Sequence, residues 1–470
     1  MRARLLLLAA ALVAFGASLG SGFHFDDYAI FANPALTTPA GVLDIWGLRD
    51  TRPLTYFTFW LNYLAGGRDP LGYHILNLAL HLGAVLLGYE CLLRLLDRRA
   101  AWLAAALFAV HPIQAEAVNY IWARSIVLAT LLCFASLLAW LDDRRWEAAG
   151  WFALALLAKE ECAAFPLVLL LLPRKRSSLP PIAAMLALSL AAGARVVYAT
   201  AVTPGAPAGL QAPVTPWHYF LAQGPVILRY FRLLIVPYGF TIDPDIHVPP
   251  LWWGLAAWIL IAALCLAAWR WRLVWFVAGI LLLIPSSTIF PAADLAADRR
   301  LYLPMIAFAA TAVLLLERAP KAVPAALVAV LALVSLSRTF VWMDDSALWR
   351  EAVERAPEKV RPHIQLARAL PAAKALEVLN RARELAPRDP AIAAEIGKTL
   401  LAEGQPDAAL AEFGRALALD PRNPLYLNNR GVALEELGQT GAARADFERA
   451  LQLDPNLTVA RENLQKLTGR

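Results

Sequence analysis

Two adjacent carboxylates, Asp26 and Asp27, stand just after the first hydrophobic segment, residues 5–19. Solubility does not require an Asp-Asp pair between aromatic residues, and ionisable groups at the edge of a membrane span are functional candidates. A carboxylate at the boundary between water and lipid can act as a general base toward a hydroxyl group. The alternative is the start of a solvated loop with an Asx-type turn.

Two further polar clusters interrupt apolar stretches. His111 and Glu116 close the apolar block at 101–118, where they could hold a metal ion or a sugar, or could cap the end of a helix. Lys159 and Glu160 break a longer apolar block in two. Charged residues in such positions face a bundle interior or a water-filled cavity rather than lipid.

Two arginines, Arg299 and Arg300, precede the segment Leu301-Tyr302-Leu303-Pro304. Guanidinium groups at the mouth of a helix suit a phosphate, because they donate paired hydrogen bonds to its oxygens. The alternative is that they are positive flanks of a membrane helix. That role is disfavoured because they fall on the external side, against the positive-inside rule.

The composition indicates a membrane protein with a smaller water-soluble part. Hydrophobic residues make up 59% of the 470 residues, only 17% are charged, and the mean hydropathy is +0.53. The net charge of +6 comes mostly from short loops, so it does not suggest a nucleic-acid partner. The four cysteines are isolated, without the spacing of a metal site or a disulfide framework, and are expected in the core.

Long apolar blocks alternate with basic clusters over residues 1–343, and the first block is expected to stay as an anchor rather than be cleaved. The positive-inside rule assigns the clusters to the cytoplasm. These clusters are Arg94/Arg98/Arg99, Arg144/Arg145, Arg174-Lys175-Arg176, Arg270/Arg272 and Arg318/Lys321. The resulting topology has about eleven crossings, with external loops at 23–73 and 199–250.

The block at 146–173 lies between two cytoplasmic clusters and must therefore cross an even number of times. A helix over 146–158 is only ~20 Å long, short of a ~30 Å hydrocarbon core. We therefore predict a short hairpin whose tip, Lys159-Glu160-Glu161, is recessed near the outer face. Two other segments are expected in the interface or re-entrant: 54–65, which is amphipathic, and 217–237.

Residues 344–470 carry an internal repeat and form a separate, extracytoplasmic domain. Gly397, Ala416 and Pro421 recur 34 residues later as Gly431, Ala450 and Pro455, which is the tetratricopeptide period. A shortened unit is expected at 362–387, a half unit at 345–357 and a capping helix at 457–468. Such α-solenoids bind peptide segments or partner proteins on a concave face.

Taken together, the ordered motifs resemble those of the tetratricopeptide-containing transmembrane O-mannosyltransferases and their bacterial relatives, which are GT-C glycosyltransferases. The motifs are Asp26-Asp27, Arg52-Pro-Leu-Thr, Asn62-Tyr63, Tyr73-His74-Ile-Leu-Asn77 with His81, His111-Pro-Ile-Gln-Ala-Glu116, Ala158-Lys159-Glu160 and Asp298-Arg299-Arg300-Leu-Tyr302-Leu-Pro304. The resemblance covers nearly the whole chain. It departs from the family at Asp298 and Gln114, where Glu and a second His are frequent.

The resemblance implies an all-α fold, a GT-C transmembrane bundle followed by the repeat solenoid. It implies inverting transfer of mannose or another hexose from a polyprenyl-phosphate donor to a Ser or Thr hydroxyl of an extracytoplasmic protein. We assign Asp26 as the base and Asp27 to orienting the acceptor or its sugar. Substrate binding is assigned to Arg52, His111, Glu116, Lys159, Glu160, Arg299, Arg300 and Tyr302.

No tightly bound cofactor or metal is expected, although Asp26, Asp27, His111 and Glu116 could instead converge on a divalent cation. The expected partners are the lipid-linked sugar, membrane lipid and an acceptor polypeptide bound by the repeats. The composition points to a bacterial inner membrane. Three alternatives stay open: transfer to a lipid or glycan, a lipid transporter or flippase, and a membrane scaffold. A transporter would need ionisable residues near the midplane with access from both faces.

Overall fold

The computed structural model describes residues 1–470 apart from 173–177, 204–207, 289, 318, 321 and 470. The described residues form helices and no strand, which confirms the predicted all-α class. The chain divides into two compact units, Met1–Asp344 and Asp345–Arg470. The predicted basic clusters Arg174-Lys175-Arg176 and Arg318/Lys321 lie outside the described residues.

Six helical segments among the described residues are long and apolar enough to cross a membrane, which makes the chain an integral membrane protein. They are Arg2–Gly20 (α1, Arg2–Phe15, with a 3-10 turn), α5 (Pro70–Leu93), Ile121–Leu141 (a 3-10 turn and α8, Arg124–Leu141), α11 (Leu179–Val202), α13 (Leu251–Arg270) and α16 (Ala322–Trp342). A seventh arises if α6 (Arg98–Val110) and the segment Pro112–Asn119 count as one span bent by 47°.

The predicted number of about eleven crossings is not confirmed. Several apolar blocks fold into helices too short to span the bilayer at 1.5 Å per residue. They are α9 (Arg145–Ala158), α10 (Phe165–Leu169), α14 (Val274–Leu283) and α15 (Met305–Leu315). Total hydrophobicity over a block does not reveal such internal breaks, and a count based on blocks therefore exceeds the number of long helices.

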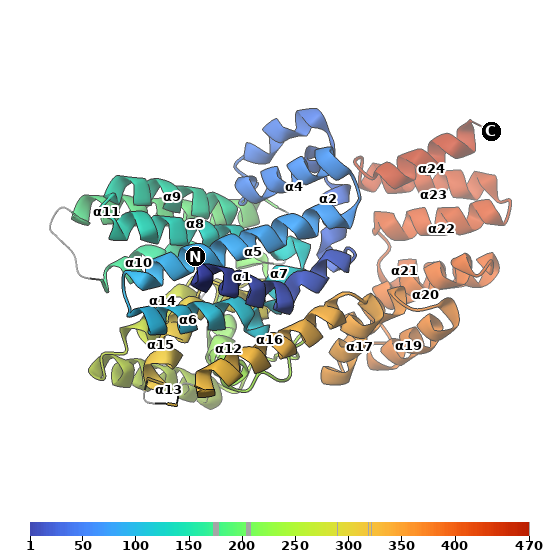
Figure 1. Cartoon of the computed structure of the whole chain (residues 1–470). Helices are drawn as coiled ribbons and strands as arrows, with labels where there is room; N and C mark the ends of the chain where they lie inside the picture. The colour runs from blue at the N-terminus through green and yellow to red at the C-terminus, as the bar shows by residue number, and fades with distance from the viewer. Residues whose placement is uncertain (173–177, 204–207, 289, 318, 321, 470) are drawn as a thin grey trace. The chain divides into compact units, whose positions relative to one another are not determined.

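The predicted hairpin is present as a pair of short helices. α9 ends at Ala158, Lys159 is extended, and a 3-10 turn over Glu160–Ala164 leads into α10. α9 packs against both α8 and α11, and the three helices lie side by side in Figure 1. Fourteen helical residues in α9 correspond to about 21 Å. The end of α9 therefore lies about 21 Å along the helix axis from its start at Arg145.

Two expected interfacial segments are helical. The segment 54–65 lies in α4 (Pro53–Gly66), which ends at Gly67 in a conformation with φ +60° that favours glycine. The segment 217–237 forms most of α12 (Pro216–Ile235), a continuous helix that contains Pro225. Thr215 caps α12, because its side chain accepts a hydrogen bond from the main-chain N–H of His218. α12 packs against α13.

The second unit consists of consecutive helices packed in pairs, and it has its own hydrophobic core. Its helices are α17 (Asp345–Arg355), α18 (Val360–Arg368), α19 (Ala372–Leu385), α20 (Pro390–Ala402), α21 (Pro406–Leu419), α22 (Pro424–Glu436), α23 (Thr440–Leu453) and α24 (Thr458–Thr468). A Cβ added at Gly397 would lie 2.7 Å from Phe413, and one at Gly431 would lie 2.6 Å from Phe447. The repeated glycines thus allow the close pairing of helices that the repeat pattern predicts.

Candidate active site

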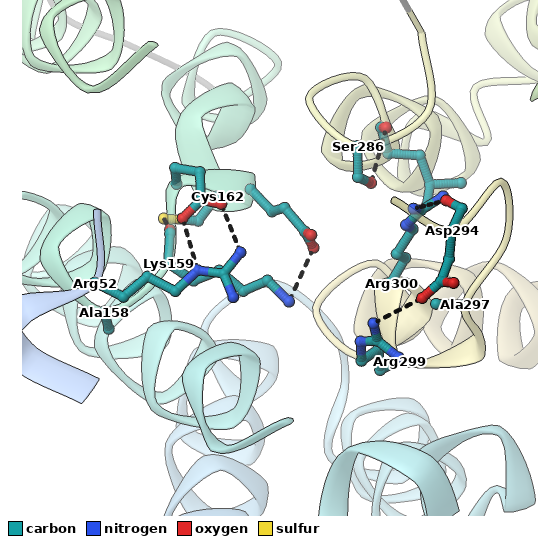
Figure 2. Close-up of polar contacts among 12 residues, drawn as sticks. Arg52, Ala158, Lys159, Cys162, Ser286, Asp294, Ala297, Arg299 and Arg300 are labelled. Carbon is teal, nitrogen blue, oxygen red and sulfur yellow. Dashed lines mark hydrogen bonds and ion pairs between the residues drawn. The ribbon is translucent and has the colours of Figure 1, made fainter. Parts of the chain in front are cut away.

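A cavity of about 560 Å³ lies where the broken helices meet, between the tip of the α9–α10 hairpin, α11 and the loop that precedes α15. Four basic side chains line it: Arg52, Lys159, Arg299 and Arg300. Figure 2 shows Arg52 and Lys159 on one side and Arg299 and Arg300 on the other. The acidic residues in its wall are Glu160, Glu161 and Asp294, and its apolar part includes Gly193, Val196, Val197, Phe290, Pro291 and Ala292.

Charged pairs fix the hairpin tip. Arg52, at the N-terminal end of α4, donates two hydrogen bonds to Glu160, at 3.0 Å from Nε and 2.7 Å from Nη2. Burial alone would raise the pKa of Glu160, but Arg52 lowers it to about 2. Thr55, one turn further along α4, donates to the carbonyl oxygen of Ala158 at 2.8 Å. α4 therefore holds the tip in place.

Lys159 is 2% exposed and lines the same cavity. Its Nζ lies 3.2 Å from a carboxylate oxygen of Glu161. Burial lowers the pKa of Lys159 to about 8, against the opposing effect of Glu161. The ammonium group is therefore protonated at neutral pH but titrates within reach of mildly alkaline conditions.

The turn Asp298–Leu301 carries two arginines whose hydrogen-bond partners differ in charge. The Arg299 side chain forms an ion pair with Glu116, and its main-chain N–H donates to the same carboxylate at 3.0 Å. The Arg300 guanidinium donates to the carbonyl oxygens of Asp294 at 2.6 Å and Leu295 at 3.0 Å. Arg300 is thus held by main-chain dipoles, while Arg299 is neutralised by a carboxylate.

Side chains of α12 hold this turn in position through hydrogen bonds and an ion pair. The Tyr230 hydroxyl donates to the carbonyl oxygen of Ala297 at 2.9 Å and accepts from its N–H at 3.1 Å. Arg229 pairs with Asp298 at 2.5 Å, and Gln223 donates to the carbonyl oxygen of Leu295 at 2.9 Å. The predicted interfacial helix therefore acts as a support for the arginine turn.

Asp26 and Asp27 lie in a 3-10 turn, Phe25–Tyr28, and neither belongs to the described lining of the cavity. The Asp27 carboxylate is fully buried and accepts hydrogen bonds from the main-chain N–H groups of His24 at 2.9 Å and Trp122 at 2.7 Å. Burial raises the pKa of Asp27 to about 7. Because Trp122 lines the cavity, Asp27 connects this turn to the cavity wall.

Asp26 is half-buried, and its main-chain N–H donates to the Tyr120 hydroxyl at 3.1 Å. The residue before it, Phe25, has φ +41°, which is uncommon for any residue other than glycine. Backbone strain of this kind persists only where the surroundings over-determine the conformation, and it concentrates at functional sites. The hydrogen bonds that the Asp27 carboxylate accepts, and the one from the main-chain N–H of Asp26 to Tyr120, hold the Phe25 backbone in this conformation.

Three residues that the sequence assigns to substrate binding, His111, Glu116 and Tyr302, do not line this cavity. Glu116 is joined to it only through its ion pair with Arg299. His111 Nδ1 accepts a hydrogen bond from the main-chain N–H of Ile113 at 3.1 Å, which is the capping role left open above. Its Nε2 donates to the carbonyl oxygen of Leu234 at 3.2 Å. The fully buried Tyr302 hydroxyl donates to Nδ1 of His81 at 2.7 Å. Neither His111 nor Tyr302 lines the cavity, because each satisfies its polar atoms within the helix packing.

Some residues of the site were not predicted. Trp122, Glu161 and Asp294 line the cavity, and Arg124, which is fully buried, lies in the chain between the lining residues Trp122 and Ser125. Arg124 donates to Asn62, Asn77, Thr58 and the carbonyl oxygen of Tyr73, and so joins α4, α5 and α8. The polar Asn residues in apolar helices were the available signal for it. Among the described residues, no three His, Cys, Asp or Glu side chains converge as metal ligands do.

Comparison with known proteins identifies related sequences. A model of the tetratricopeptide repeat matches residues 394–457. The chain is 44% identical over 152 residues to protein O-mannosyl-transferase Tmtc1 of Drosophila melanogaster, covering 29% of this chain and 17% of the relative. It is 37% identical over 141 residues to protein O-mannosyl-transferase TMTC3 of Mus musculus, covering 27% and 15%.

Human protein O-mannosyl-transferase TMTC4 is 36% identical over 167 residues, covering 29% of this chain and 22% of the relative. The chain thus spans about a fifth of the length of these curated relatives. A solved structure of ArnT from Cupriavidus metallidurans, bound to undecaprenyl phosphate, aligns with 94% of this chain and 79% of its own at 13% identity, with a TM-score of 0.40. The sequence matches confirm the resemblance to the tetratricopeptide-containing transmembrane O-mannosyltransferases that the motifs predict.

Proposed function

We propose that this chain transfers a sugar, mannose or another hexose, from a polyprenyl-phosphate donor to a Ser or Thr hydroxyl of an extracytoplasmic protein, with inversion at the anomeric carbon. The observation that carries the proposal is the cavity in which four basic side chains meet the apolar residues of α11. A lipid phosphate needs both kinds of surface. The similar proteins named above are described as protein O-mannosyl-transferases.

The phosphate would lie among Arg52, Lys159, Arg299 and Arg300. When the bond between the anomeric carbon and the phosphate oxygen breaks, its electron pair stays on that oxygen, and the leaving group gains negative charge. Hydrogen-bond donors already aimed at this charge lower the barrier. Arg300 is the strongest candidate, because its bonds are to carbonyl oxygens, whereas the other three cations each contact a carboxylate.

The acceptor hydroxyl would lose its proton to Asp26 as its oxygen forms the new bond to the anomeric carbon. Asp27 is less suited to contact the acceptor than we predicted, because it is fully buried and both carboxylate oxygens accept main-chain hydrogen bonds. We assign it to positioning Asp26 and Trp122. The proposal needs no tightly bound cofactor and no nucleic-acid partner. It places the site and the repeat unit outside the cytoplasm of a bacterial cell.

Mass spectrometry of extracytoplasmic proteins from cells with and without this protein tests the proposal. We expect loss of a hexose from Ser or Thr residues of one or more proteins when the chain is absent. Unchanged proteins, together with a changed lipid-linked or polymeric glycan, would contradict the acceptor class and favour transfer to a lipid or glycan. No change in any glycan would contradict the transferase assignment as a whole.

A further inference from the structure

A second cavity, of about 260 Å³, adjoins the first and lies between α9 and α11. Its walls are Ala153, Leu156 and Leu157 of α9, with Leu188, Ala191, Ala192, Arg195 and Val196 of α11. Thr51, Glu160 and Val196 line both cavities. The Arg52–Glu160 ion pair therefore stands at the boundary between a cation-lined space and an almost wholly apolar one.

The two charged side chains that line the second cavity are engaged with other partners. Arg195 donates to the carbonyl oxygens of Gly47 at 2.8 Å, Leu48 and Asp50, and Glu160 accepts both bonds from Arg52. Apart from Thr51, the remaining lining residues offer an occupant only hydrocarbon surface. On α11, Leu188 is 37% and Leu190 is 77% exposed, so this helix borders lipid in a membrane-embedded unit.

We propose that this second cavity holds the first isoprenoid units of the lipid donor, so that the donor enters laterally between α9 and α11. The inference rests on the proposed function, since it assigns a place to the hydrocarbon chain of the same substrate. At the ~30 Å³ that a water molecule occupies in the liquid, the cavity has room for about nine non-hydrogen atoms. That corresponds to about two five-carbon units next to the phosphate.

Continuity with the cation-lined cavity favours this occupant over an ordinary membrane phospholipid. A chain that leaves a phosphate bound near Arg52 and Lys159 reaches the second cavity across Thr51 and Val196. In a membrane there is no hydrophobic gain from moving a chain out of lipid, so the cavity would act through shape and van der Waals contact. A bulky side chain inside it should therefore exclude the chain sterically.

The test measures the binding of two probes, undecaprenyl phosphate and ethyl phosphate, to the purified full-length protein. Ala192 and Ala153 line only the second cavity, from opposite walls. We expect Ala192→Trp and Ala153→Phe to raise the Kd for undecaprenyl phosphate at least tenfold and to leave that for ethyl phosphate unchanged. The matched control is Leu190→Trp, which puts the same bulk on the exposed face of α11.

The outcomes separate this inference from the proposed function. If the wild-type protein binds undecaprenyl phosphate and the two cavity variants bind it equally well, the chain lies elsewhere and only the inference is overturned. If the wild type binds neither probe, both are overturned. Should the variants fail to fold, a photoreactive group on the second isoprene unit of undecaprenyl phosphate should label α9 or α11 in the wild-type protein. Labelling confined to α13 or α16 would overturn the inference.

Discussion

Arg52 and Glu160 form a two-pronged ion pair across 108 residues of sequence, with donor–acceptor distances of 3.0 and 2.7 Å. The pair joins the start of α4 to the tip of the α9–α10 hairpin, and both side chains border the candidate active site. It therefore fixes the part of the wall that carries Lys159. Each side chain keeps about a quarter of its surface exposed, so solvent screens the pair in part.

The first prediction concerns this pair. Arg52→Met and Glu160→Met should each lower the apparent melting temperature of the detergent-solubilised protein, because each leaves a charged partner without its hydrogen bonds. The double variant should melt no lower than the worse single variant, with a coupling energy of about 0.5–3 kcal/mol, as found for groups in direct contact. Additive losses in the double variant would show that the two residues act independently. Arg144→Met, at an exposed ion pair, is the control.

The second prediction concerns the base. Asp26→Asn should lower sugar transfer by about 10²–10⁴-fold, the usual contribution of general-base catalysis. Melting temperature and undecaprenyl phosphate affinity should stay at wild-type values, because Asp26 is half-buried and is not part of the hydrophobic core. Near-normal transfer in purified Asp26→Asn would contradict the assignment. If Asp27→Asn is inactive instead while folded, the two aspartates exchange roles.

The third prediction concerns the pH dependence of stability through Asp27. Burial raises the pKa of Asp27 to about 7 in the folded protein, above its ordinary value of 3.8. The folded state therefore holds a proton that the unfolded state has lost between these pH values, and stability must fall as pH rises through this window. Thermal melting from pH 4 to 8 should show this loss in wild type and a smaller one in Asp27→Asn. Parallel profiles would show that Asp27 is ionised throughout.

The sequence predicts those parts of this arrangement that are encoded within a short stretch of the chain. The hairpin tip is predictable, because Lys159-Glu160-Glu161 interrupts an apolar block between two basic clusters. The arginine turn is predictable as well, because Arg299 and Arg300 contradict the charge bias expected of their side. The repeat glycines reveal the helix pairs of the second unit through their period.

Long-range partners were not predictable. Glu116 meets Arg299 across 183 residues, and the Asp27 carboxylate meets a main-chain N–H of Trp122 across 95. Nothing in the spacing of His111 or Tyr302 distinguishes a ligand from a side chain that satisfies its neighbours. The predicted number of crossings is not confirmed, because short helices such as α14 are as apolar as the six helical segments long enough to span a membrane.

The fourth prediction uses Lys159, whose pKa burial lowers to about 8. Below that pH the ammonium group carries its charge, and above it the charge is lost, so affinity for undecaprenyl phosphate should weaken as pH rises past about 8. The ligand does not titrate there, since the second pKa of a phosphate monoester is about 6. Lys159→Arg should move the decline to higher pH, and Lys159→Gln should bind weakly without that step. A wild-type affinity that is constant from pH 7 to 9.5 would contradict a phosphate contact for Lys159.

The fifth prediction concerns the repeat unit, which we expect to select the acceptor without taking part in the chemistry. The unit begins at Asp345, and Leu348 and Trp349 of its first helix are buried in packing that includes α18. A truncation should therefore remove all of 345–470 rather than keep the half unit that the repeat pattern suggests. The truncated protein should bind undecaprenyl phosphate as wild type does and should still glycosylate a short Ser/Thr peptide slowly.

Transfer to a full-length acceptor should collapse in the truncated protein, because the concave face of a repeat solenoid supplies the contacts that hold an extended polypeptide. Gly397→Leu offers a milder version in the full chain, since any side chain at this position meets Phe413 at 2.7 Å and forces one helix pair apart. Gly414→Ala, with open space around its Cβ, is the matched control. Normal transfer to the full acceptor after truncation would assign the repeats to another task, such as self-association. Protease protection that places the C-terminus in the cytoplasm would be more damaging, because it would separate the repeats from an external active site.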